Sequence, residues 1–283
     1  MSTPLAAVAE ARKALGGRLR DLRRQAGFAT ARAFAARAGW SEAKVSRIEH
    51  GKTTPGEDDL RMYARLSGDP AVYADLYAAA AHIEEMYVEW SRVHQAGLAP
   101  VQEAAVPQYE RTRHFRIYEP GVIPGLLQTP AYAKAIMGRI IDFWGIPDDA
   151  GQAADVRTRR KAAVLRDAGR RFGFVLEEAA LRAKFGDTAT MAAQLAHLTA
   201  VSVWPQVSLG IIPLGAQRTM WPNEGFWIFD EERVVIELAG AEMTLKEPSQ
   251  ITTYARVFAE LARMAVFGKD ARALIGDAIN ALE

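Results

Sequence analysis

The stretch that most limits what this chain can fold into runs from Thr30 to Pro55, TARAFAARAGWSEAKVSRIEHGKTTP. Thr30 and Ser41 are residue types that favour a helix N-cap, and each precedes a short run with helical spacing. Gly39 lies between the runs, where glycine can take the left-handed conformation that ends a helix. The stretch therefore predicts two short helices joined by a tight turn.

The second predicted helix has one face for a core and another for the solvent. Val45 and Ile48 are three residues apart, so we expect them to point inward together. The residues left facing outward are Glu42, Ala43, Lys44, Ser46 and Arg47. This is the layout of a helix-turn-helix whose second helix enters the major groove of DNA.

The outward residues can be given separate roles in DNA binding. We expect Arg47 to read bases, because a guanidinium can pair with guanine O6 and N7. Glu42 could accept from a cytosine amino group or could only favour the helix dipole, and Lys44 is expected to contact phosphate. The other expected DNA contacts are Ser41, Ala43, Ser46, Arg24, Arg32, Lys52 and Thr53. For each charged residue, the alternative is a solvated surface charge.

The charge distribution also indicates phosphate binding at one end of the chain. Residues 1–68 contain 13 Lys and Arg against 7 Asp and Glu, whereas residues 69–283 contain 22 against 27. A basic region suits a polyanionic partner. We expect Glu49, one of the few acids there, to pair with Arg18 or Arg23 inside the fold rather than to touch DNA.

Residues 15 to 68 resemble the XRE/Cro-like DNA-binding domains of phage repressors. In that family a turn glycine is followed by a capped helix with an ending close to Ile-x-x-x-Glu-x-Gly, and here the closing part is VSRIEHGKTTP, Val45–Pro55. The resemblance implies binding to double-stranded DNA. Because one such domain covers few base pairs, we expect a homodimer with its recognition helices about one DNA turn apart.

Length and composition narrow the class of protein. A chain of 283 residues with 49% hydrophobic residues is long enough for two globular domains. The absence of cysteine excludes disulfides, cysteine zinc sites and thiol catalysis. Neither a signal peptide nor an apolar run of membrane-spanning length is evident, so we expect a cytoplasmic, nucleoid-associated protein without a membrane partner.

We expect three parts: a helix-turn-helix domain at residues 1–68, a helical linker at 69–99 and an α+β domain at 100–283. The linker should contain one long helix, Ala71–Trp90, whose apolar stripe packs on the second domain or on a second subunit. Tyr109, Phe115 and Ile117 suggest a short extended piece. Further strands are expected at 171–176, 207–212, 225–229, 234–238 and 243–245. The predicted fold class is mainly α, with a small α+β second domain whose helices surround a mostly antiparallel sheet.

A second resemblance covers essentially the whole chain. Phe115–Ile136, FRIYEPGVIPGLLQTPAYAKAI, is followed by arginines at 157, 159 and 160, LEEAALR at 176–182, QLAHL at 194–198 and VSLGIIP at 207–213. The series resembles the actinobacterial WhiJ-like regulators, in which an XRE-type domain precedes a domain without assigned biochemistry. Residues 119–129 are its most specific part. Trp221-Pro222-Asn223 departs from it, because a smaller, glycine-rich loop is expected there.

The WhiJ-like resemblance implies a transcriptional regulator of development or secondary metabolism. Members of that family are antitoxin-like in arrangement and are often encoded beside a small protein. The resemblance thus implies a small protein partner encoded by a neighbouring gene.

Aromatic residues gather near the predicted sheet. They are Tyr118, Trp204, Trp221, Phe226, Trp227 and Phe229. They could be core, or they could form a pocket for a small-molecule effector or a groove for a partner. Both faces of strand 225–229 are apolar, so its second face needs cover from a helix, a subunit or a ligand.

Signals for catalysis are weak. The histidines lack metal-ligand spacing, and no HExxH, Walker A or GxGxxG motif occurs. Glu177 and Glu178 are adjacent, and neighbouring helix positions do not face each other. We therefore expect no enzyme activity, cofactor or metal. Four basic residues, Arg157, Arg159, Arg160 and Lys161, could line an anion site or could form a solvated helix face.

Overall fold

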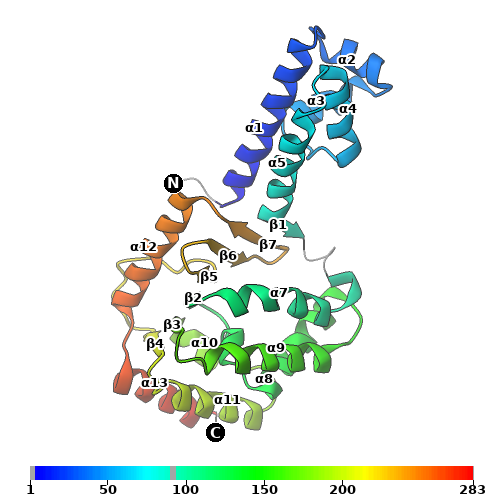
Figure 1. The fold of residues 1–283 in the computed structure, drawn as a ribbon. Coiled ribbons are helices and arrows are strands. Elements are labelled where there is room, and N and C mark those ends of the chain that lie inside the picture. Colours follow the sequence, from blue (N-terminus) through cyan, green and yellow to red (C-terminus); the bar gives the residue numbers. More distant parts are fainter. Residues whose placement is uncertain (1–3, 90–93, 283) are drawn as a thin grey trace. The chain divides into compact units, whose positions relative to one another are not determined.

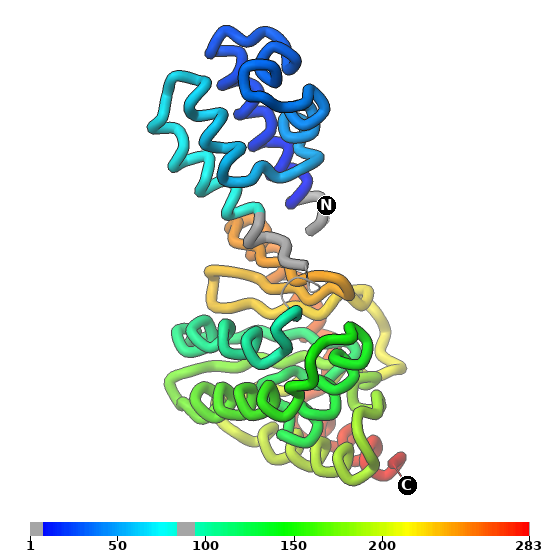
Figure 2. The backbone as a smooth tube through the Cα atoms, turned by 90° about the vertical axis from the view of Figure 1, so that its right-hand side faces the viewer, coloured from blue at the N-terminus to red at the C-terminus, as the bar shows by residue number. Residues whose placement is uncertain are grey.

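The computed structural model describes residues 4–89 and 94–282. Contacts within the chain separate two units, which can be followed by colour in Figures 1 and 2. Unit 1 ends at Val88 and unit 2 begins at Glu89. A short strand, β1 (Tyr87–Glu89), lies at the boundary.

Unit 1 is built from helices, coloured blue to cyan in Figure 1. They are α1 (Pro4–Gln25), α2 (Ala31–Ala38), α3 (Glu42–Glu49), α4 (Glu57–Ser67) and α5 (Val72–Met86). Helix α1 contacts α3, α4 and α5. The buried side chains of this core include Leu15, Leu19, Phe34, Val45, Ile48, Leu60, Tyr63, Leu76 and Ile83.

Helix α5 belongs to unit 1, which differs from the expected linker at 69–99. Its buried residues Leu76, Ala80 and Ile83 lie on the apolar stripe, and the helix contacts α1 and α4. The stripe is therefore covered within unit 1 instead of by another domain or subunit. Trp90, the expected end of this helix, lies outside the described residues.

Two glycines let α1 cross the end of α3 at short range. A Cβ atom on Gly16 would lie 2.6 Å from the Ile48 carbonyl oxygen. Gly51 has a φ of 67°, and a Cβ atom there would lie 2.7 Å from the backbone nitrogen of Lys13. Backbone therefore packs on backbone at both places, which fixes where α3 sits on the bundle.

Unit 2 contains a mixed sheet of six strands in the order β7-β6-β5-β2-β3-β4. The strands are β2 (His114–Glu119), β3 (Arg171–Glu177), β4 (Val207–Ile212), β5 (Phe226–Phe229), β6 (Arg233–Glu237) and β7 (Ala241–Leu245). The pairings β2·β3 and β3·β4 are parallel, and β2·β5, β5·β6 and β6·β7 are antiparallel. The expected class, a helical N-terminal domain followed by helices around a small sheet, is confirmed.

The helical elements of unit 2 connect and cover these strands (Figure 1). They are η1 (His94–Ala96), α7 (Ala99–Arg111), η2 (Gly125–Leu127), α8 (Pro130–Trp144), α9 (Ala150–Leu165), α10 (Glu178–Arg182), α11 (Thr188–Val201), α12 (Pro248–Met264) and α13 (Gly268–Asn280). Parallel strands need such crossovers, and α8 with α9, then α10 with α11, provide them.

Helix α7 corrects the expectation of an extended piece at Tyr109. Residues 99–111 form a helix instead, and Pro100 lies in its first turn, where a missing N–H costs little. The helix also tolerates Pro107 in its interior. Tyr109 is therefore a buried helical residue, and the extended piece begins only at His114.

Both faces of the sheet are covered by helices of the same unit. Phe115, Phe172 and Trp227 share one buried cluster with side chains of α7, α8, α9, α11 and α13. On the other face, Phe226 packs against Tyr254 of α12, with ring centroids 5.0 Å apart. Strand β5 thus obtains its second cover from α12.

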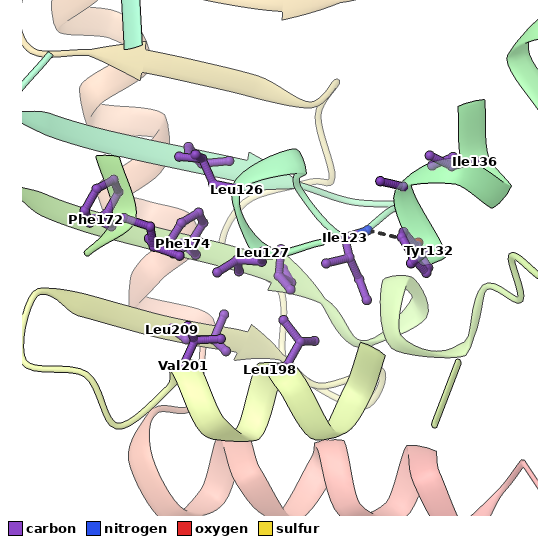
Figure 3. Close-up of a cluster of buried hydrophobic side chains, with 14 of the residues drawn as sticks. Ile123, Leu126, Leu127, Tyr132, Ile136, Phe172, Phe174, Leu198, Val201 and Leu209 are labelled. Carbon is purple, nitrogen blue, oxygen red and sulfur yellow. Dashed lines mark hydrogen bonds between the residues drawn. The ribbon is translucent and has the colours of Figure 1, made fainter. Parts of the chain in front are cut away.

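Figure 3 shows the part of the buried cluster around η2. Leu126 and Leu127 of η2, Phe172 and Phe174 of β3, and Leu198 and Val201 of α11 belong to the same cluster. Nearby, the backbone nitrogen of Ile123 donates to the Tyr132 hydroxyl at 3.4 Å. The GLLQ segment is therefore a core element that joins the first crossover to the sheet.

Candidate nucleic-acid interface

The turn between α2 and α3 forms as the sequence predicts. Thr30 Oγ1 accepts from the backbone nitrogen of Ala33 at 3.1 Å, which caps α2. Gly39 ends that helix with a φ of 72°. Ser41 Oγ then accepts from the backbone nitrogen of Lys44 at 3.2 Å and caps α3. These caps define both helix starts and hence which residues of α3 face outward.

The outward face of α3 carries the residues that we expected to meet DNA. Val45 and Ile48 are buried, whereas Glu42, Ala43 and Arg47 are exposed. Ser46 is half-buried, and its hydroxyl lies 3.5 Å from the His50 ring. The Arg47 side chain makes no hydrogen bond or ion pair to any described residue, so its guanidinium is available to a ligand.

Other exposed groups of unit 1 share this availability. Arg24, Arg32, Lys52 and Thr53 are exposed, as is the cap residue Ser41. None of the three cations forms an ion pair with another residue in the described part of the chain. They lie on α1, on α2 and just after α3, so they flank the recognition helix in sequence on both sides.

Lys44 differs from these cations because the fold already holds its side chain. Its Nζ lies 2.6 Å from Asp59 Oδ1 of α4 and 4.2 Å above the Trp40 ring. Trp40 in turn lies against Phe34 and Tyr63. The ammonium group therefore ties α3 to α4, which distinguishes Lys44 from the unpaired cations around it. The sequence offered no local signal for a pairing with Asp59.

Glu49 supports the fold, as expected, through Arg23 rather than Arg18. Arg23 Nε donates to Glu49 Oε1 at 2.6 Å and Arg23 Nη2 to Oε2 at 2.9 Å. The Tyr63 hydroxyl also donates to Oε1 at 3.2 Å. The hydrogen bonds that Arg23 donates to Glu49 raise the pKa of Arg23. Arg18 pairs instead with Asp75 of α5 at 3.3 Å.

In unit 2 the six aromatic residues that we singled out do not surround one site. Tyr118, Phe226, Trp227 and Phe229 are buried sheet residues. Trp204 is half-buried against the core, and Trp221 is 62% exposed. Tyr118 and Phe226 share one face of the sheet, while Trp227 and Phe229 lie on the other. Four of the six are thus core, which leaves Trp221 as an isolated exposed ring.

Sequence reasoning missed several polar residues that the fold of unit 2 brings together. Gln102 lies on α7, Glu119 ends β2 and Gln128 follows η2, and all three interact with Arg157 of α9. Glu119 and Gln128 were indicated only because they lie in Phe115–Ile136, the segment that resembles WhiJ-like regulators. No pattern indicated Gln102, because its partners on α9 are more than fifty residues away.

Comparison with known families assigns both units. A family described as a helix-turn-helix domain matches residues 14–72, which contain the α2–α3 turn and its exposed cations. A family described as a domain of unknown function, DUF5753, matches residues 102–277, more than half of the chain. The chain belongs to the DUF5753 family. No curated protein and no solved structure matches this DUF5753 protein.

The DUF5753 protein therefore carries a helix-turn-helix DNA-binding domain ahead of its family domain. In the described part of the chain, no helix combines the length and apolarity needed to cross a membrane. Among the same residues, no cluster of three His, Asp or Glu side chains is arranged to hold a metal ion.

Proposed function

We propose that this protein is a sequence-specific transcriptional regulator that binds double-stranded DNA through α3. The observation that carries the proposal is the Arg47 guanidinium. It is exposed on the outward face of a capped recognition helix and has no partner among the described residues. Arginine in such a position can pair with guanine in the major groove.

The side chains around α3 divide into base contacts and phosphate contacts in this proposal. Arg47 reads a base edge, and Glu42, Ala43 and Ser46 line the same face. Arg24, Arg32, Lys52 and Thr53 contact the phosphate backbone, which sets position and not sequence. Lys44 orients α3 through Asp59.

The protein acts as a homodimer in this proposal, because a single α3 covers too few base pairs to specify an operator. Two copies would place their recognition helices about one DNA turn apart and match a palindromic site.

Regulation belongs to the DUF5753 domain in this proposal. The WhiJ-like resemblance of Phe115–Ile136 supports an antitoxin-like actinobacterial regulator of development or secondary metabolism, located in the cytoplasm on the nucleoid and modulated by a small neighbouring protein. No enzymatic reaction is part of it. The alternative is a repressor that responds to a small molecule through unit 2.

Binding of the purified protein to DNA upstream of its own gene tests the proposal. Fluorescence anisotropy should show binding that resists competitor DNA and weakens with salt. Arg47→Ala should weaken specific binding by about 1–3 kcal/mol and relax the base preference. Arg139→Ala, which removes the same charge from an exposed position of α8, is the matched control. Equal binding by wild type and Arg47→Ala would show that α3 is not the reading helix.

The same assay separates the two modes of regulation. Addition of the small protein encoded next to the gene should change the affinity if the antitoxin-like mode holds. If the small protein leaves the affinity for DNA unchanged, the result would favour the small-molecule alternative.

A further inference from the structure

The four basic residues of α9 do not share one environment. Arg159 points outward, with a side chain that is 68% exposed and pairs with Glu103 at 3.0 Å. Lys161 donates to the Gln128 carbonyl oxygen at 2.6 Å. Arg160 is buried and Arg157 is half-buried, one helical turn apart on the same inner side. The basic run is thus neither one solvated face nor one site, because only part of it turns inward.

The two inward guanidinium groups contact neutral oxygen atoms. Gln102 Oε1 of α7 accepts from Arg157 Nε and from Arg160 Nη2, both at 3.1 Å. Gln128 Oε1 accepts from Arg157 Nη1 at 2.7 Å. Arg160 also lies 4.1 Å above the ring of Tyr109. Two cations therefore converge on a side-chain amide, and no described carboxylate forms a salt bridge with either.

Other arginines of unit 2 are treated differently by the fold. Arg170, Arg182 and Arg218 pair with Asp167, Glu178 and Glu177 at 2.6–2.8 Å. For Arg157 and Arg160 no described carboxylate lies within salt-bridge distance, although the charges of Glu237 and Glu119 act on Arg157 from further away. Burying two like charges without a carboxylate in direct contact is unfavourable, so the pair favours an additional anionic partner.

Two donor positions at the pair remain unused. Arg160 Nε is buried and has no hydrogen-bond partner. Arg157 Nη2 makes no hydrogen bond to any described residue, and the half-buried state of this side chain leaves part of it accessible. Burial, followed by the charge of Arg160, lowers the pKa of Arg157 to about 10, against the opposing charges of Glu237, Tyr109 and Glu119. An oxyanion would relieve this strain because it supplies negative charge and acceptors together.

A buried carboxyl group lies close enough to Arg157 for the two charges to interact. Glu119, at the end of β2, is buried, and its Oε1 accepts from Trp227 Nε1 at 2.9 Å. Burial and the charge of Glu237 raise the pKa of Glu119 to about 8, against the opposing effects of the Trp227 hydrogen bond and the Arg157 charge. The charge of Arg157 therefore lowers the pKa of Glu119 only in part, and Glu119 does not form a salt bridge that neutralises Arg157.

Glycines bring the backbone close to both charged groups. A Cβ atom on Gly125 would lie 3.4 Å from Arg157 Cδ and Nε, and one on Gly225 would lie 2.6 Å from Glu119 Oε2. A side chain at residue 225 would displace the Glu119 carboxylate, whereas one at residue 125 would make only an ordinary contact with Arg157.

We propose that unit 2 binds a small molecule through an oxyanion, a carboxylate or phosphoryl group, held by the guanidinium groups of Arg157 and Arg160. Glu119 hydrogen-bonds a polar group of the same molecule. The proposal goes beyond DNA binding and does not depend on it, since all of these residues lie in the DUF5753 domain.

Thermal unfolding of the full chain at pH 7 tests the site with simple probes. Inorganic phosphate and acetate, compared with chloride at equal ionic strength, represent the phosphoryl and carboxylate classes. At least one oxyanion should raise the Tm by several degrees in a saturable manner, because a ligand that binds only the folded state stabilises it. Arg157→Gln should abolish the response. Arg159→Gln, which removes the same charge from the outer side of the same helix, should retain it.

Gln102→Glu provides an independent test if Arg157→Gln does not fold. This change places a carboxylate between the two guanidinium groups with almost no change in shape. The Tm in chloride should rise above that of wild type, and the response to oxyanions should disappear. Gln217→Glu, at an exposed loop position, should do neither.

Three results would overturn the proposal. The first is a wild-type Tm that is equal in phosphate, acetate and chloride. The second is an oxyanion response that Arg157→Gln retains or that Arg159→Gln loses to the same degree. The third is a Gln102→Glu protein that is no more stable than wild type in chloride, which would show that the arginine pair needs no anion.

Discussion

Lys44 and Lys52 lie eight residues apart, yet only one of them is free. Lys44 forms an ion pair with Asp59 and a cation–π contact with Trp40, whereas the exposed Lys52 has no described ion-pair partner. From the sequence we expected both to contact DNA, because each lies on or next to the recognition helix. The structure assigns them different ones.

This difference predicts different responses to salt. Lys52→Ala should reduce the slope of log affinity against log salt by about 1, since one phosphate contact releases about one counterion. Lys44→Ala should leave that slope nearly unchanged and should instead lower the stability of unit 1. Salt titrations of DNA binding, paired with urea unfolding of each variant, measure both effects. If the slope of log affinity against log salt falls equally in both variants, Lys44 contacts phosphate as Lys52 does.

Glu119 predicts a dependence of stability on pH. Its pKa is about 8 in the folded protein against an ordinary value of 4.5. Between these values the unfolded chain releases the proton and the folded chain keeps it, so the free energy of unfolding should fall as the pH rises from about 5 to 8. Glu242, with a pKa raised to about 7 by burial and by Glu237, contributes in the same direction.

Glu119→Gln should make this decline with pH less steep, because an amide can still accept from Trp227 but does not titrate. Urea unfolding at pH 5, 6, 7 and 8 measures it. Glu103→Gln, on the exposed side of α7, should run parallel to wild type. Parallel curves for wild type and Glu119→Gln would mean that the Glu119 carboxyl titrates normally.

At the scale of elements, α1 contains two adjacent glycines with opposite surroundings. Gly16 faces the Ile48 carbonyl oxygen at a distance too short for a Cβ atom, and Gly17 has nothing within 4 Å of its Cβ position. Gly17→Ala should therefore stabilise unit 1 by about 0.5–1 kcal/mol, the usual gain in helix propensity. Gly16→Ala should destabilise it, since the clash with backbone exceeds that gain.

Urea unfolding of the two alanine variants gives the comparison directly, and each serves as the control for the other. Two variants that are both more stable than wild type would show that α1 can move away from α3. The sequence cannot distinguish the two glycines, because the residues around them do not show which one another helix approaches.

The same distinction between local signals and contacts with distant elements explains how much of the fold could be predicted from the sequence. Local signals predicted α2 and α3 well, because Thr30, Gly39 and Ser41 act on backbone groups within four residues. They failed at α7, where Tyr109 was expected in an extended piece but lies in a helix that its tertiary packing stabilises. The strands were found from their apolar runs, but no local pattern shows that β2 pairs in parallel with β3.

The candidate sites follow the same division. The outward face of α3 could be predicted, since helical periodicity alone determines it. The aromatic residues around β5 could not be assigned to core or pocket, because that choice depends on α12, whose contact with Phe226 comes from nearly thirty residues further on. The arginine pair of α9 was visible, but Gln102 was not.

For the whole molecule, the division at residue 88 predicts that unit 1 folds by itself. Its helices bury their own apolar stripe, α5 included. A fragment of residues 1–88 should unfold cooperatively and bind DNA more weakly than the full protein, with retained salt dependence. Trp40 is the sole tryptophan in this fragment, so its fluorescence reports unfolding and, through Lys44, the environment of α3.

A fragment without cooperative unfolding would show that α5 needs unit 2 to hold its position. A matched fragment of residues 1–71, which lacks α5, should be markedly less stable, because it exposes the surface that Leu76 and Ile83 cover.

Strand β2 sits in the middle of the sheet, with a parallel neighbour on one side and an antiparallel neighbour on the other. Its parallel partner β3 begins at Arg171, whereas its antiparallel partner β5 begins at Phe226, 107 residues after β2 ends at Glu119. During synthesis at roughly 5–20 residues per second, one edge of β2 waits about 5–20 s for its partner after the ribosome has passed Glu119. For that interval the nascent chain offers an unpaired strand edge, and a chaperone or another nascent chain competes with β5 for it.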